Sequence, residues 1–79
     1  MRKYYYEEQL EIIVEEIKSY ITNSSLDSAE KGTYLNELNE NKRNFLGLVK
    51  SGVFHDACGK LISISFSGES YCAEVETEY

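Results

Sequence analysis

The spacing of apolar residues changes from helical to alternating along this chain of 79 residues. In the first part, apolar residues fall on one face of a helix that advances about 100° per residue, namely Tyr6, Leu10, Ile13, Val14, Ile17, Tyr20 and Ile21. Leu35, Leu38, Phe45, Leu48 and Val49 repeat this spacing further on. We therefore predict helices over about 4–22 and 28–51. The second begins after an Asp27 cap or, alternatively, after Gly32 with Thr33 as cap, and it ends before Gly52 as a left-handed residue.

The last part of the chain predicts a β-hairpin with strands over about 60–66 and 71–77. A two-residue turn at Gly68 and Glu69 sorts the apolar residues onto one face through the pairs Ser67–Ser70, Phe66–Tyr71, Ile64–Ala73 and Ile62–Val75. The other face then carries Ser65–Cys72, Ser63–Glu74 and Leu61–Glu76. Because two strands alone are marginally stable, residues 53–57 are a candidate third strand.

These elements predict an α+β fold in one small domain, 1–79. Two N-terminal helices pack on a C-terminal antiparallel hairpin or three-stranded meander, in the order ααββ(β). A chain of this size hides only about 60% of the surface of its unfolded form, so it has little room for a buried active site with many residues. A binding module is the default expectation.

Charge and hydropathy narrow the choice of location and partner. The chain has 8 Lys and Arg against 14 Asp and Glu, for a net charge of −6. It has no apolar run long enough to cross a bilayer and no apolar segment after Met1 that resembles a secretion signal, so we expect a cytoplasmic protein, in a bacterial cell or a phage-infected host. It also lacks the cationic surface that nucleic acids and anionic membranes attract. We expect a partner protein with a basic surface.

Residues that could carry covalent or metal chemistry are few. The chain has one histidine and two cysteines, and the candidates are His55, Asp56, Cys58 and Cys72. A closed zinc site needs four ligands, and Cys72 is placed opposite Ser65, well along the strand from Cys58. We therefore expect no catalytic residues, no metal and no cofactor, and a protein that is not an enzyme.

Acidic residues gather at two places. Five glutamates lie within ten residues of the first helix, and Glu69, Glu74, Glu76 and Glu78 lie on the hairpin. Opposite the apolar stripe of this helix, Tyr5 and Ile12 are flanked by glutamates, a pattern typical of an interface with an apolar centre and a polar rim. A plain solvated helix face with one exposed isoleucine is the alternative interpretation. The predicted partner-binding residues are Tyr5, Glu7, Glu8, Glu11, Ile12, Glu15, Glu16, Glu74 and Glu76.

Together these features suggest a small acidic inhibitor that occupies a basic, nucleic-acid-binding site of a target protein. Phage anti-defence proteins such as anti-CRISPR proteins, DNA mimics, antitoxins and nuclease immunity proteins share this profile as a matter of composition, and no motif of one such family is present. The alternative is a regulatory or adaptor protein that forms a homodimer through the exposed edge of the hairpin or through Tyr5 and Ile12.

Overall fold

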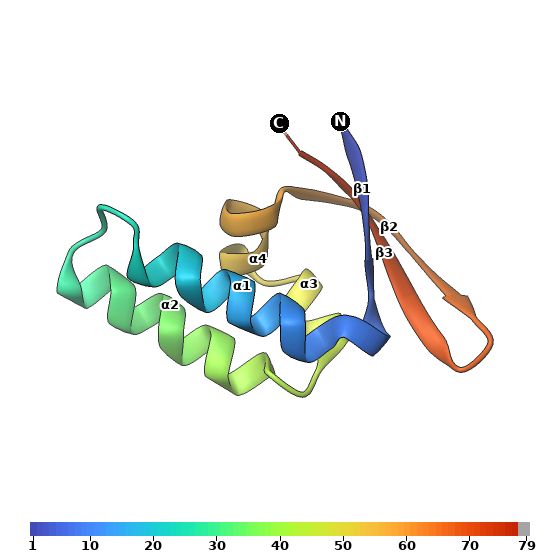
Figure 1. Cartoon of the computed structure of the whole chain (residues 1–79), viewed down its shortest axis with the longest axis horizontal. Coiled ribbons are helices and arrows are strands. Elements are labelled where there is room, and N and C mark those ends of the chain that lie inside the picture. Colours follow the sequence, from blue (N-terminus) through green and yellow to red (C-terminus); the bar gives the residue numbers. More distant parts are fainter. Residues whose placement is uncertain (78–79) are drawn as a thin grey trace.

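The computed structural model describes residues 1–77 and has an α+β fold, in which helices cover one face of a three-stranded antiparallel sheet (Figure 1). Strands β1 and β2 both pair with β3, which is the central strand. The elements in chain order are β1 (Arg2–Tyr6), the 3-10 helix η1 (Glu7–Gln9), α1 (Leu10–Thr22), α2 (Ser28–Asn41), α3 (Phe45–Val49), α4 (Gly52–Cys58), β2 (Lys60–Ser67) and β3 (Ser70–Glu76).

The first helix begins later than predicted, because residues 2–6 form strand β1. This strand runs antiparallel to β3, with Tyr5 opposite Ala73 and Tyr6 opposite Cys72. Three consecutive tyrosines carry no period of their own, so they fit a strand or a helix equally well. Residues 2–6 form a strand because the free edge of β3 supplies partners for their backbone hydrogen bonds. The prediction of helix from residue 4, with Tyr6 in its core stripe, is therefore wrong.

The second predicted helix is divided into α2 and α3. Its start at Ser28 is confirmed, and the Asp27 carboxylate caps it by accepting from the Glu30 amide at 2.8 Å. The break comes at Asn44, whose side chain accepts from the Gly47 amide at 3.1 Å and so begins a new helix. Gly52 is not left-handed and does not end this segment, because it is the first residue of α4.

The predicted third strand at 53–57 is instead helix α4. Ser51 caps it: its hydroxyl oxygen accepts from the Phe54 amide at 3.3 Å and its hydroxyl donates to the Leu48 carbonyl at 2.6 Å. Val53 and Phe54 are both fully buried. Adjacent residues of a strand point to opposite faces, so a strand on a sheet covered on one side would expose one of them.

The hairpin is confirmed, with a two-residue turn at Gly68 and Glu69. Its predicted register holds from Ser67–Ser70 to Ser63–Glu74. Ile62 is then an extra residue, a β-bulge, so Leu61 lies opposite Val75 and Lys60 opposite Glu76. The predicted pairs Ile62–Val75 and Leu61–Glu76 are wrong for this reason.

The core lies between the sheet and the helices. The helical period of α1 is confirmed by the burial of Ile13, Ile17 and Ile21, and the alternation of β3 by the burial of Ala73 and Val75. Helices α1 and α2 lie side by side, while the tip of the hairpin projects beyond them (Figure 1). Within residues 1–77, every helix is too short or too polar to cross a lipid bilayer.

Candidate protein-binding surface on helix α1

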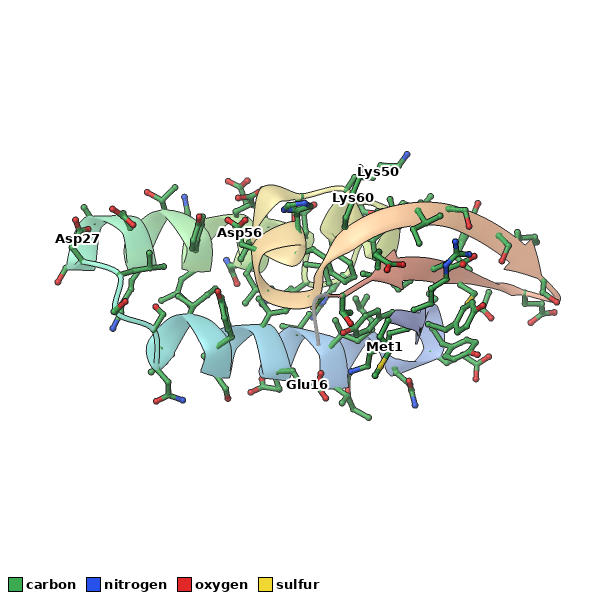
Figure 2. All side chains as sticks on the ribbon, turned by 90° about the horizontal axis from the view of Figure 1, so that it is seen from above. Met1, Glu16, Asp27, Lys50, Asp56 and Lys60 are labelled. Atoms are coloured by element: carbon green, nitrogen blue, oxygen red, sulfur yellow. The ribbon has the colours of Figure 1, made fainter. Side chains whose placement is uncertain are left out.

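The side of α1 that faces away from the core carries acidic residues around one large apolar residue. We call this surface the acidic face, and it consists of Glu11, Ile12, Glu15, Glu16 and Ser19. Ile12 is 58% exposed, whereas Ile13 beside it is buried, because successive helical residues point about 100° apart. Figure 2 shows Glu16 on the outer side of α1, away from the core.

Ile12 lies where two surface hollows meet. The first is the shallow hollow of the acidic face itself. The second is a groove between the η1–α1 segment and the turn after α2, where Lys42 and Arg43 form part of the wall. Glu11, Ile12 and Glu15 line both hollows. A side chain from a partner could therefore contact Ile12 and a carboxylate at the same time.

The glutamates of the acidic face are not neutralised by neighbours. Within residues 1–77, no Lys, Arg or His nitrogen lies within 4.0 Å of the carboxylates of Glu11, Glu15 or Glu16. All three residues are exposed to solvent. Their charges are therefore available to a cationic partner, which would not have to break an existing ion pair.

Glu7 and Glu8 have a structural role as well as a charge. The Glu7 carboxylate accepts from the Tyr71 amide at 3.1 Å, next to the point where β1 ends on β3. The Glu8 carboxylate accepts from the Ser70 hydroxyl at 3.2 Å. These bonds fix η1 against the start of β3. Because both donors are neutral, the two carboxylates still add to the negative field beside the acidic face.

Glu74 and Glu76 lie on a different surface, and each forms an ion pair. Glu74 accepts from the Arg2 guanidinium at 2.6 Å, and Glu76 lies 3.6 Å from the same guanidinium and 3.4 Å from the N-terminal ammonium. The β1–β3 register brings these groups together on the sheet. The structure therefore does not join Glu74 and Glu76 to the acidic face, and Glu78 lies outside the described residues.

Tyr5 is part of the core and not of an exposed surface. Only 7% of it is exposed, and its ring meets that of Phe54 edge to face, with centroids 5.3 Å apart and planes at 75°. Burial raises the pKa of its hydroxyl, to which the nearby Cys58 thiol also contributes, and the Lys3 ammonium lies 5.2 Å from the ring centroid. The prediction that Tyr5 lies exposed beside Ile12 is wrong, because Tyr5 is in a strand.

Lys42 and Arg43 are the residues near this surface that the sequence argument missed. A continuous helix over 28–51 would place them on its solvated side, but the break before Asn44 turns them toward the groove beside α1. The signal in the sequence is the asparagine at each end of the Asn41–Asn44 segment, since asparagine favours helix caps and turns. These two cations limit the negative field at one border of the acidic face.

A polar cluster lies where Tyr34 of α2 meets α4. The Tyr34 hydroxyl donates to Asp56 at 2.7 Å, and Asp56 lies 3.5 Å from the His55 ring nitrogen. The hydrogen bond to Asp56 raises the pKa of Tyr34, which makes this phenol a weaker acid and a poorer source of a nucleophile. Over residues 1–77, no three His, Cys, Asp or Glu side chains are grouped to hold a metal ion.

The two thiols lie in different places. Cys58 is buried on α4, and burial raises its pKa, although the hydrogen bond with Tyr5 acts in the opposite direction. Cys72 is half-buried on β3, opposite Tyr6 and Ser65. A buried thiol with a raised pKa holds little thiolate at neutral pH, so Cys58 is a poor nucleophile.

Comparison with known proteins adds no family to this description. No protein-family model matches the chain, and neither a curated protein nor a solved structure is significantly similar to it. The features that bear on function therefore lie on the surface of the molecule, above all on the acidic face of α1.

Proposed function

We propose that this protein is a small acidic inhibitor that binds another protein, without catalysis, and occupies a basic site that normally holds nucleic acid. A phage anti-defence protein, a DNA mimic, an antitoxin or an immunity protein acts in this way. The observation that carries the proposal is the acidic face, where three carboxylates without ion partners surround the exposed side chain of Ile12.

The spacing of the glutamates suits a surface that binds a nucleic-acid backbone. Glu11 and Glu15 lie one turn apart on α1, which is about 6 Å along the helix axis. Every second phosphate of one DNA strand is about 7 Å further along the duplex axis. Lysines and arginines that contact such phosphates could contact these two carboxylates without large rearrangement, and Glu7 and Glu8 extend the negative charge toward β3.

Charge and apolar contact would contribute differently to this binding. Negative carboxylates attract a basic target over several ångströms and raise the rate of encounter, an effect that salt weakens. Ile12 would then pack in an apolar part of the partner and slow dissociation. The target is blocked because the same cationic groups cannot hold nucleic acid and this protein together.

The test begins with affinity capture from a bacterial lysate at low salt and continues with the captured protein in purified form. Its affinity is measured for the wild type, for the double variant E11K/E15K, and for the control E30K/E40K. Both variants change the net charge from −6 to −2, and all four positions are exposed. They differ only in whether the reversed charges lie on the acidic face.

We expect E11K/E15K to lose at least about tenfold in affinity, since each reversal replaces an attraction with a repulsion, and E30K/E40K to lose much less. The affinity of the wild type should also fall steeply between low and moderate salt. Equal losses in the two variants, or an affinity that salt does not change, would overturn the proposal.

A further inference from the structure

Strand β2 is an edge of the sheet with little to prevent it from pairing with another strand. The order β1-β3-β2 leaves one side of β2 without a partner strand among residues 1–77. Edge strands are usually protected by charges, by proline or by a cover. β1, at the other edge, carries Arg2 and Lys3, whereas residues 61–67 of β2 carry no charge and no proline.

The turn determines which backbone groups of β2 are free. Ser67 and Ser70 close a two-residue turn, so the backbone groups of Ser67, Ser65 and Ser63 point toward β3. Those of Ile64 and Phe66 consequently point outward, away from the sheet. A second strand laid along this edge would find its hydrogen-bonding partners at alternate residues.

Two exposed apolar side chains lie at the matching positions of this edge. Ile62 is 42% exposed and Phe66 is 59% exposed, and Ile64 lies midway between them in the strand. The tip of the hairpin, next to Phe66, projects beyond the helices (Figure 1). Phe66 keeps one contact within the chain, with the ring of Tyr71 at 4.8 Å between centroids.

The strand is complementary to itself when it is turned end to end. If two copies of β2 run antiparallel with Ile64 opposite Ile64, then Ile62 of each copy lies opposite Phe66 of the other. The bulge at Ile62 shifts the pairing beyond it by one residue, so the exposed Lys60 of each copy lies next to the turn of the other copy, which carries the exposed Glu69. Apolar residues meet apolar residues, and opposite charges meet at both ends.

We propose that this protein forms a two-fold symmetric dimer in which the β2 strands of two copies pair antiparallel about Ile64. The result is one continuous sheet of six strands, β1-β3-β2 from each copy. The bulge at Ile62 limits the regular part of the new ladder to Ser63–Ser65 of each copy, and Phe66 meets the bulged Ile62 at either end. The inference stands independently of the proposed function.

The dimer would carry two acidic faces. Glu16 on α1 and Lys60 at the start of β2 lie on opposite sides of the molecule (Figure 2). Pairing through β2 therefore leaves α1 of each copy accessible. A dimeric inhibitor could occupy two basic sites, and its binding to a partner that presents such sites in pairs would gain from the linkage of the two contacts.

The test is sedimentation equilibrium of the full chain over a wide range of concentrations, with two matched variants. Phe66→Lys places a charge in the proposed interface, whereas Ile12→Lys makes the same kind of change at an equally exposed residue of α1. We expect the wild type to dimerise and Phe66→Lys to weaken the dimer at least about tenfold, because each dimer loses two apolar cross-strand pairs. Ile12→Lys should leave the dimer unchanged.

Hydrogen exchange of single amides identifies the interface directly. In a β2 dimer, the outward amides of Ile64 and Phe66 become protected as concentration rises, whereas those of Ser63 and Ser65, bonded to β3, are protected at every concentration. A monomer at all concentrations, or a dimer in which the Ile64 and Phe66 amides still exchange freely, would overturn the inference. Neither result bears on E11K/E15K, so failure here is distinguishable from failure of the proposed function.

Discussion

Replacing Tyr5 tests most directly how the N-terminal segment folds. If Tyr5 were on a frayed helix end, its side chain would be exposed, and Tyr5→Ala would change the free energy of unfolding by less than about 0.5 kcal/mol. In the structure Tyr5 is a buried residue of β1 that packs on Phe54. Removing a large buried aromatic side chain costs about 3–5 kcal/mol, because the site loses its contacts and a cavity remains.

The control is Tyr4→Ala on the same strand. Tyr4 is 52% exposed and lies opposite Glu74 on the face of the sheet that the helices do not cover, so its loss should cost about 0.5 kcal/mol or less. The two variants make the same chemical change at adjacent positions. Only the alternation of a strand gives them different environments.

The measurement is urea unfolding followed by circular dichroism, with free energies from linear extrapolation. A chain of 79 residues has a total stability of about 4–12 kcal/mol, so Tyr5→Ala could leave no folded protein at all. Tyr5→Phe therefore serves as a milder variant, since it removes only the hydroxyl near Cys58 and should cost about 0.5–1.5 kcal/mol. Equal stability of Tyr5→Ala and Tyr4→Ala would refute the strand and the packing argument together.

Two further predictions concern the backbone and pH. Gly59 has a φ of +128°, and an added Cβ would collide with the Glu76 carbonyl oxygen, so Gly59→Ala should cost more than about 1–3 kcal/mol in urea unfolding. Gly32→Ala, in α2 with open space around it, should instead stabilise the protein by about 0.5–1 kcal/mol, and the opposite order would contradict the structure. Burial raises the pKa of Tyr5 and of Cys58, so the unfolded chain loses these protons at lower pH than the folded one. The stability that these two groups contribute should therefore be constant below about pH 8.5, the pKa of an unfolded cysteine, and fall as pH rises above it. Stability that does not change up to about pH 10 in a thermal or urea series would show that these groups are not buried.

The acidic face could be found from the sequence because it needs only the period of one helix. Once Ile13, Ile17 and Ile21 define the buried stripe, the helical angle places Ile12 and Glu15 on the outer side. The surroundings of Glu74 and Glu76 could not be predicted in this way. Arg2 reaches Glu74 and Glu76 only because β1 pairs with β3, and these partners are more than 70 residues apart in the chain.

The misassigned segments share a cause. The apolar pattern around Val53 and Phe54 is too short to distinguish a strand from a helix. The helix forms because Ser51 caps it and because both side chains are buried against neighbouring elements. In the second helix, the cap at Asn44 ended a run that apolar spacing alone would continue. The spacing of apolar residues over a long segment does not reveal a helix break that a single capping side chain makes.

What the sequence determined by itself is local: the amphipathic face of α1 and the hairpin turn at Gly68. Each depends on residues within a few positions of one another, so the intrinsic preferences of those residues suffice. The tertiary structure alone decided that the N-terminal tyrosines form a strand and that Tyr5 is buried while Ile12 is exposed. The physical reason is that a strand satisfies its backbone hydrogen bonds only on a neighbour, and here that neighbour is at the far end of the chain.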